Sequence, residues 1–309
     1  MLHHVTAIAS DLEANLRFYS QTLGLRLVKV TVNFDDPGSY HLYYGNDLGE
    51  PGTLVTFFLW PGADRGRAGA GQVTSMGLAV PGGSLDYWRE RLDDAGVRHD
   101  SVGGARLALR DPDGLTVELI ERPGCEAWPY VSAGPVVREH AVRALDAPTL
   151  SVRDAAATAG FLEQMLGMSA QGRSEDGARY QLVADADGDA PARWLDVVGA
   201  PDASAGAFGP GTVHHVAFRA ADDDAQQASR ERLRAARVAV SEVRERVYFR
   251  SIYFREPGGV ICEIATDGPG MAADESPAAL GSALRLPPWL ESQREEIEKI
   301  LPAIPRPTA

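Results

Sequence analysis

The sequence predicts an α+β fold in which four βαβββ units form two curved, barrel-like mixed sheets. Three observations predict it. The chain repeats itself at an offset of about 143–145 residues. Short apolar runs of strand length are separated by glycine and proline. A segment with helical spacing of apolar residues follows the opening run of each half, so that strands and helices recur in a fixed order.

The internal repeat fixes the number of units. Segments of the two halves align as pairs: residues 6–11 with 149–154, 23–25 with 166–168, and 109–120 with 254–265. Because each half contains two strand–helix openings, it divides again into two units, and the chain therefore contains four.

The first unit shows how each element is justified. Residues 2–9 are an apolar run that predicts a strand, and Ser10 or Asp11 can cap the helix that follows. Gly24 predicts the end of that helix. The apolar residues of one helical face are Leu12, Leu16, Tyr19 and Leu23. Further strand-like runs follow at residues 25–32, 40–44 and 54–60.

Helices at residues 84–95 and 222–236 fit the same scheme in the second and fourth units. We therefore expect the following division of the chain: an N-terminal half at 1–124 with units at 1–61 and 72–123, a linker at 125–139, a C-terminal half at 140–268 with units at 142–200 and 212–267, and a tail at 269–309. Residues 269–285 are rich in Ala, Gly and Pro and are expected to wrap loosely over the surface, before a short charged helix near 289–301.

Composition narrows the class of protein. A net charge of −13 over 309 residues argues against nucleic-acid and anionic-membrane partners. No apolar run approaches the roughly 20 residues that span a bilayer, and no signal-peptide pattern opens the sequence. Cys125 and Cys262 are too few for a disulfide framework, so we expect a cytoplasmic protein.

Two His-His pairs stand in strand-like runs far apart in the sequence. They are His3-His4 and His214-His215, and Glu263 lies in a third such run. A buried imidazole is costly unless its lone pair is used. Two imidazoles and one carboxylate are the donors of a facial metal triad that leaves positions open. Because neighbours on a strand point to opposite faces, only one histidine of each pair should line the site.

The repeat supplies an internal comparison for these positions. His4 aligns with Ala147, and His215 aligns with about Met76, so the fold itself does not require histidine there. Glu263 aligns with another glutamate, Glu118, which lacks neighbouring histidines and is expected to be paired or partly solvated. We predict a metal site at His4, His215 and Glu263, in preference to hydrogen-bonded core histidines.

This assignment constrains the architecture. The ligands come from the first and fourth units, so these units should form one sheet around the metal, and the second and third units should form the metal-free one. The last strand of the first unit, residues 53–60, offers no carboxylate, so a four-ligand site is not expected. His41, His99 and His140 follow no repeat pattern and are expected at the surface or in loops.

Residues 2–6, 214–217 and 251–259 together resemble the vicinal oxygen chelate superfamily, which includes glyoxalases, bleomycin resistance proteins and extradiol dioxygenases. More narrowly, they resemble its ring-cleaving dioxygenases of the hydroquinone-cleaving branch. Residues 31–45 and 286–290 are also typical of that branch, and the resemblance covers nearly the whole chain.

The resemblance implies Fe(II), with Mn(II) as an alternative, held by the same triad, and an aromatic substrate that reacts with O2. It also implies a set of residues around the ligands. We expect a homo-oligomer, because half-exposed sheets of this kind often pair. Candidates for catalytic proton transfer and for holding negative charge are Tyr253, His214 and Arg246, and His3 and Thr6 surround the metal ligands. Two other functions stay open: a glyoxalase-type metal-dependent isomerase or lyase, and a non-catalytic binding protein for hydrophobic phenols or drugs.

Overall fold

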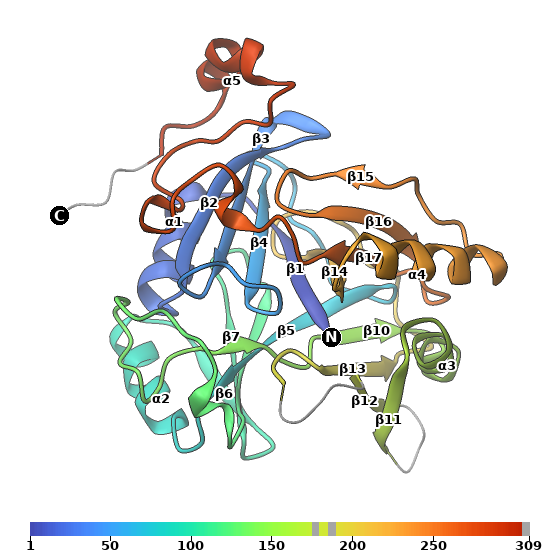
Figure 1. Cartoon of the computed structure of the whole chain (residues 1–309). Helices are drawn as coiled ribbons and strands as arrows, with labels where there is room; N and C mark the ends of the chain where they lie inside the picture. The colour runs from blue at the N-terminus through green and yellow to red at the C-terminus, as the bar shows by residue number, and fades with distance from the viewer. Residues whose placement is uncertain (175–178, 185–189, 305–309) are drawn as a thin grey trace.

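The computed structural model describes residues 1–174, 179–184 and 190–304. Within these residues an eight-stranded sheet, which we call the first sheet, combines strands from both ends of the chain. Figure 1 shows it in blue and orange. Its strands are β1 (Leu2–Ala9), β2 (Arg26–Asn33), β3 (Asp36–Gly45), β4 (Leu54–Leu59), β14 (Val213–Ala220), β15 (Arg244–Glu245), β16 (Arg250–Arg255) and β17 (Ile261–Thr266).

The second sheet is built from the middle of the chain and is nine-stranded over the same described ranges. Its strands are β5 (Gln72–Val80), β6 (His99–Val102), β7 (Arg106–Arg110), β8 (Thr116–Glu121), β9 (Ala144–Leu145), β10 (Thr149–Val152), β11 (Met168–Arg173), β12 (Arg179–Ala184) and β13 (Trp194–Gly199). Parallel and antiparallel neighbours occur in both sheets. The mixed α+β class is therefore confirmed.

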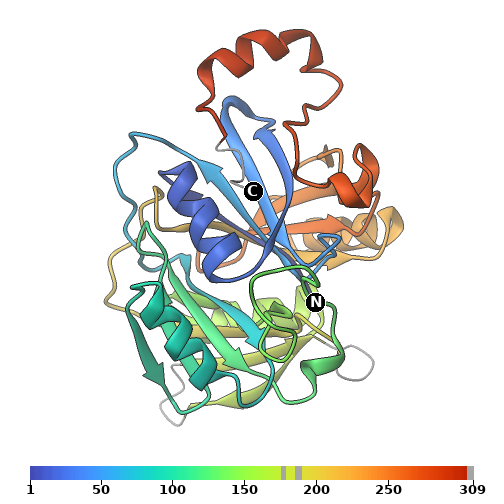
Figure 2. The ribbon, with the colours of Figure 1, turned by 90° about the vertical axis from the view of Figure 1, so that its left-hand side faces the viewer.

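The helices begin where the sequence offers caps. Asp11, Asp154 and Asp222 each accept a hydrogen bond from the backbone N–H three residues on, at the start of α1, α3 and α4. Figure 2 shows α1 and α2 on the same side of the molecule. The helices are α1 (Leu12–Leu16) with its π-helical continuation η1 (Arg17–Thr22), α2 (Leu85–Asp94), α3 (Ala155–Leu166), α4 (Asp223–Ala235) and α5 (Arg294–Ile300). Among the described residues no helix has the length and hydropathy needed to cross a membrane.

The pairing of β1 with β14 joins the first unit to the fourth. The two strands run antiparallel, with Val5 opposite Val216 and Thr6 opposite His215. In the second sheet, β5 and β10 pair in the same antiparallel way. The predicted combination of first with fourth and second with third units is therefore confirmed.

The strand register corrects one alignment made from the sequence. Ala217 lies opposite Glu263 on β17, and Gly77 lies opposite Glu118 on β8. His215 therefore corresponds to Ser75, and the alignment of His215 with Met76 was wrong by one residue. Because side chains alternate along a strand, this shift places Met76 on the other face, where it is fully buried in the hydrophobic core.

The tail is bound closely to the first sheet, so the expectation of loose wrapping was wrong. The fully buried Lys29 on β2 forms ion pairs with Asp274, at 2.5 Å, and with Glu275. Its Nζ also lies 4.7 Å from the ring centroid of Tyr248. The backbone N–H of Arg285 donates to the Val30 carbonyl at 2.9 Å. A buried ammonium needs such partners, and only the tail and the first sheet together supply them.

Replacing Lys29 with Met keeps the apolar stem but removes the buried cation beside Glu275, whose carboxylate then keeps only the longer ion pair with Arg285, at 3.4 Å. Because removing one member of a buried ion pair costs about 3–5 kcal/mol, we expect K29M to lower the free energy of unfolding by that amount. Urea unfolding followed by tryptophan fluorescence measures it.

Arg294→Ala is the control, because Arg294 pairs with Glu291 and Glu298 at the surface of the tail. Exposed pairs contribute less than about 1 kcal/mol. Equal losses in the two variants would contradict the role given to Lys29.

Candidate metal centre

Residues from opposite ends of the chain converge in one buried group. His4 on β1, His215 on β14 and Glu263 on β17 each offer a ligand atom, and these atoms lie within 4.8 Å of one another. The Nε2 atoms of the two histidines are 3.2 Å apart. The Oε2 atom of Glu263 lies 3.4 Å from Nε2 of His4 and 2.8 Å from Nε2 of His215. We call these three residues the triad.

The strand register explains the convergence. β1, β14 and β17 are adjacent in the first sheet. His4 lies opposite Ala217, which in turn lies opposite Glu263, so the two triad residues flank a small side chain. His215, two positions before Ala217, points to the same face. Alanine leaves room for the three larger side chains to meet above it.

The first histidine of the N-terminal pair fixes the second. His3 is buried, and burial lowers its pKa to about 3, so its ring is neutral. Its Nε2 lies 3.2 Å from the carbonyl oxygen of Thr266, which can only accept a hydrogen bond. The proton of His3 is therefore on Nε2, and its Nδ1 accepts from Nδ1 of His4 at 2.9 Å. This leaves Nε2 of His4 with a free lone pair that points into the triad.

The second pair has the same arrangement. Nδ1 of His214 lies 2.8 Å from Nδ1 of His215, so the hydrogen bond is again on the side of the ring away from the triad. Burial lowers the pKa of His215, and the imidazole keeps the lone pair that a metal requires. The expectation that only one histidine of each pair lines the site does not hold for the second pair, since His215 belongs to the triad and His214 lines a cavity beside it.

Glu263 supplies a buried negative charge. Its Oε1 accepts from Oγ of Ser251 at 2.5 Å, whereas Oε2 faces the two imidazoles without a hydrogen bond of acceptable geometry. Burial alone would raise the pKa of Glu263, but His4 and His215 hold it well below its usual range. A fully buried carboxylate oxygen that lacks a donor is stabilised by a cation.

A second group of polar residues lies beside the triad. Nε of Arg246 donates to the hydroxyl oxygen of Tyr253 at 3.2 Å, and Nη2 of Arg246 donates to Asp35 at 2.7 Å. The Tyr253 ring lies 5.9 Å from that of His215, centroid to centroid. Asp35 follows β2 and Arg246 follows β15, the two edge strands of the first sheet, so this ion pair joins the sheet edges.

Two cavities that share part of their lining lie at the triad. The inner cavity is about 30 Å³ and is lined by the triad and by Asn33, Phe34, His41, Tyr43, Phe58, Arg246, Phe249 and Tyr253. The outer cavity is about 360 Å³, shares five of these residues, and adds Asp35, Trp60, His214, Ser241, Arg244 and Ile261. Aromatic rings form much of both walls, as a planar apolar ligand requires.

His41 corrects a prediction from the sequence. It was expected in a loop or at the surface, but it lies on β3 and lines the inner cavity. Its ring centroid is 4.5 Å from that of Phe58 and 4.1 Å from that of Tyr43. The alternation of β3, in which Tyr43 follows His41 by two residues, was the available signal, because it places both side chains on one face.

The second sheet holds no comparable set of histidines among the described residues. Glu118 pairs with Arg106 at 3.0 Å, and Arg106 also reaches Asp196 at 3.2 Å. The prediction that Glu118 is a paired carboxylate is therefore confirmed. The guanidinium of Arg106 balances the carboxylate of Glu118, and the residue that corresponds to Glu118 in the first sheet is Glu263.

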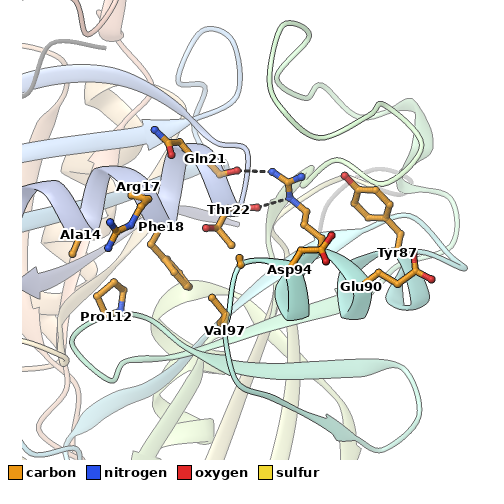
Figure 3. Close-up of a pocket in the computed structure, with 12 residues that line it drawn as sticks. Ala14, Arg17, Phe18, Gln21, Thr22, Tyr87, Glu90, Asp94, Val97 and Pro112 are labelled. Carbon is orange, nitrogen blue, oxygen red and sulfur yellow. Dashed lines mark hydrogen bonds between the residues drawn. The ribbon is translucent and has the colours of Figure 1, made fainter. Parts of the chain in front are cut away.

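A larger hollow lies between η1 and α2, away from the triad (Figure 3). It measures about 590 Å³. Arg91 donates there to the backbone carbonyl oxygens of Gln21 and Thr22, at 2.5 and 2.8 Å, and so ties the two helical segments together. Its lining offers Glu90 and Asp94 but no histidine, so we place the candidate centre at the triad despite the greater size of this hollow.

Comparisons with known proteins agree with this architecture. Over 303 residues the chain is 41% identical to MhqO of Bacillus subtilis strain 168, which is named a ring-cleaving dioxygenase. The match includes 96% of this chain and 94% of MhqO. It is 37% identical over 311 residues to the chlorohydroquinone/hydroquinone 1,2-dioxygenase of Sphingobium indicum, with 96% of this chain and 94% of that protein covered.

Solved structures extend the comparison to the fold. A Bacillus subtilis crystal structure named as a dioxygenase matches with a TM-score of 0.92 and 38% identity, over 98% of this chain and 97% of that one. Maize glyoxalase I matches with a TM-score of 0.63 at 18% identity, over 86% of this chain and 92% of that one, which shows a shared fold alone. The family model described as "Glyoxalase/Bleomycin resistance protein/Dioxygenase superfamily" matches residues 1–119 and 144–264. The chain belongs to the glyoxalase/bleomycin resistance protein/dioxygenase superfamily.

Proposed function

We propose that this protein is a non-haem Fe(II)-dependent dioxygenase that cleaves the ring of a hydroquinone- or catechol-type substrate with O2. One observation carries the proposal: the buried convergence of His4, His215 and Glu263 at the end of an aromatic-walled cavity. The names of the relatives, ring-cleaving and hydroquinone dioxygenases, support it.

The donors fit such a metal. Two imidazole nitrogens with free lone pairs and one buried carboxylate oxygen are the ligand set of iron(II) oxygenases, and Mn(II) accepts the same donors. The Oε2 atom of Glu263 lacks a hydrogen bond, as expected of a metal ligand. When bound, the metal would supply a redox centre that lowers the pKa of a substrate hydroxyl and activates dioxygen.

Tyr253 is suited to donate a proton. Burial, and then the charge of Glu263, raise the pKa of its phenol, so the hydroxyl is protonated at neutral pH. Arg246 donates to the phenol oxygen and so directs the hydroxyl proton away from itself. We propose that Tyr253 gives this proton to the oxygen atom that acquires charge as the O–O bond breaks.

Arg246 is suited to stabilise negative charge that develops on the substrate. Burial alone would lower the pKa of Arg246, but Tyr253 and Asp35 outweigh burial and raise this pKa above its ordinary value. The guanidinium is therefore charged. Asp35 fixes one side of the guanidinium at 2.7 Å and leaves its other donors toward the outer cavity. A fixed cation in a partly buried site stabilises an anionic transition state without first having to reorganise.

His214 is suited to donate a hydrogen bond, because its Nδ1 accepts from Nδ1 of His215 and its single proton is therefore on Nε2. Burial lowers its pKa to about 3, so its imidazole is neutral at physiological pH. It lines the outer cavity between the rings of Phe58 and Phe208, with centroid distances of 5.4 and 5.3 Å. We propose that its Nε2–H donates a hydrogen bond to the substrate oxygen that enters beside these rings and so helps to hold the negative charge of that oxygen.

The rival functions have less support. An isomerase of this architecture would use a fourth protein ligand, but β4 presents Thr56 beside Thr6 on this face of the sheet. A binding protein for phenols or drugs would not need the triad. We include cytoplasmic location in the proposal, because Cys125 and Cys262 are both free and buried. We also include a homo-oligomeric state, because half-exposed sheets of this kind often pair.

Substitution of the triad tests the proposal. We expect anaerobically iron-loaded wild type to consume O2 with a hydroquinone or catechol and to release a ring-opened acid containing both atoms of labelled dioxygen. His215→Ala and Glu263→Gln should lose bound iron and more than about 100-fold of the O2 uptake, because each removes one of three ligands. Metal analysis, an oxygen electrode and mass spectrometry give the readouts.

The matched controls come from the second sheet. His99→Ala and Glu118→Gln should keep iron and uptake, since neither residue lies near the triad. Uptake that survives in H215A would refute the ligand assignment. Tightly bound zinc without O2 consumption would favour the isomerase.

Tyr253→Phe tests the proton donor. The ring and its packing remain, but the hydroxyl that Arg246 orients is lost, so we expect kcat to fall about 100- to 10,000-fold with iron content unchanged. Tyr44→Phe is the control, because it also removes one buried hydroxyl, bonded to Asn15 at 2.8 Å, but leaves the cavity intact. Similar kcat values for Y253F and wild type would exclude Tyr253 as the donor.

A further inference from the structure

Four side chains form a continuous hydrogen-bonded chain beside the triad. The hydroxyl of Tyr43 lies 2.9 Å from Nδ1 of His41, and Nε2 of His41 lies 2.9 Å from Oγ1 of Thr56. Oγ1 of Thr56 lies 2.7 Å from Oγ1 of Thr6. We call these residues the His41 chain. Thr6 is two positions from His4 and opposite His215, so the chain ends on the strand that carries a triad residue.

The tautomer of His41 sets the direction in which hydrogen bonds are donated along this chain. Burial, and then the imidazoles of His4 and His215, lower its pKa well below the usual value, so the ring carries one proton. With the proton on Nε2, His41 donates to Thr56 and accepts from Tyr43, and the hydroxyl hydrogen of Thr6 is free at the far end. With the proton on Nδ1, the order reverses and the hydroxyl hydrogen of Tyr43 is free.

Both arrangements have the same consequence. Within the chain every link has one donor and one acceptor, and one hydroxyl hydrogen at an end is left for another partner. Tyr43 is 2% exposed and lines the inner cavity with the triad. Burial, and then Tyr253, raise the pKa of Tyr43 well above its usual value, so its hydroxyl keeps its hydrogen. Replacement of His41 by an apolar residue would break both links at once.

The packing around His41 favours a role in the site over a role in the core. Its ring lies against Phe58, which lines both cavities, and against Tyr43. The ring of Tyr43 in turn contacts those of Tyr248 and Phe249, with centroids 6.1 and 6.4 Å away. Hydroxyl groups held in this way are fixed on two sides, as precise contacts to a small ligand require.

We propose that His41 is a positioning residue of this site, whose ring holds the Tyr43 hydroxyl where it contacts the substrate or oxygen in the inner cavity, and through Thr56 fixes the Thr6 hydroxyl on the strand that carries His4. The inference rests on the proposed dioxygenase function. It assigns His41 a role through hydrogen bonds alone and requires no change in its charge.

Two substitutions at His41 separate positioning from other roles. His41→Leu removes both hydrogen bonds, whereas the amide of His41→Gln offers one donor and one acceptor at nearly the same spacing as the imidazole nitrogens. We expect H41L to lose about 100-fold in kcat with KM within about threefold and iron content unchanged, because misplaced contacts act on the reacting state. H41Q should recover most of that kcat.

The control is His99→Leu, an imidazole-to-leucine change on β6 of the second sheet, which should keep wild-type kinetics. Wild-type kcat in H41L would overturn the proposal. A kcat in H41Q as low as in H41L would also overturn it, since an amide can hold the hydroxyls but cannot shuttle a proton as an imidazole does.

A second test does not depend on the folding of H41L or on the proposed function. In metal-free protein labelled with nitrogen-15 in histidine, the ring of His41 should show one protonated nitrogen, and Tyr43→Phe and Thr56→Val should each change its nitrogen shifts. Unchanged shifts in both variants would overturn the hydrogen-bonded chain. If the shifts change but iron-loaded wild type cleaves no ring, the proposed function fails while the chain itself stands.

Discussion

The antiparallel pairing of β1 with β14 is the constraint on which the rest of the site depends. It brings together His4 and His215, which are 211 residues apart in the sequence. Loop-closure entropy opposes such a contact, and the burial of every residue of β1 offsets that entropy. β14 then positions β17, and with it Glu263. The site therefore exists only when the two ends of the chain have folded onto each other.

An open sheet of this kind has two edge strands. In this molecule an ion pair joins the two edges of the first sheet. β2 and β15 are the edge strands of the first sheet. Asp35 and Arg246 connect the two edges beside the cavity, and the tail is bound to the β2 edge through the ion pair of Asp274 with Lys29. The ion pair also fixes the guanidinium that we assign to the reaction. The same two residues, Asp35 and Arg246, therefore join the sheet edges and fix a side chain of the proposed active site.

Features that follow from the internal repeat or from the alternation of side chains along a strand could be predicted from the sequence. The triad stood out because the aligned segments of the other units lack histidine, with Ala147 opposite His4 and about Met76 opposite His215, and the unit pairing followed from it. The division of the chain at 125–139 stays our proposal. His41 and the partners of Lys29 could not be predicted, because their roles come from contacts between segments far apart in the sequence. The error at Met76 arose because alignment by sequence cannot detect a one-residue shift in strand register.

The guanidinium of Arg106 between Glu118 and Asp196 has a consequence for the two halves of the molecule. In the second sheet the balancing cation is part of the polypeptide and is present as soon as the chain folds. In the first sheet the corresponding carboxylate, Glu263, would under the proposed assignment be balanced by an ion taken from solution. A chelator would accordingly act on the two sheets unequally: one would keep its internal neutralisation, and the other would be left with an excess anion. Under that assignment, dependence on the supply of metal would be confined to one half of a nearly symmetric molecule.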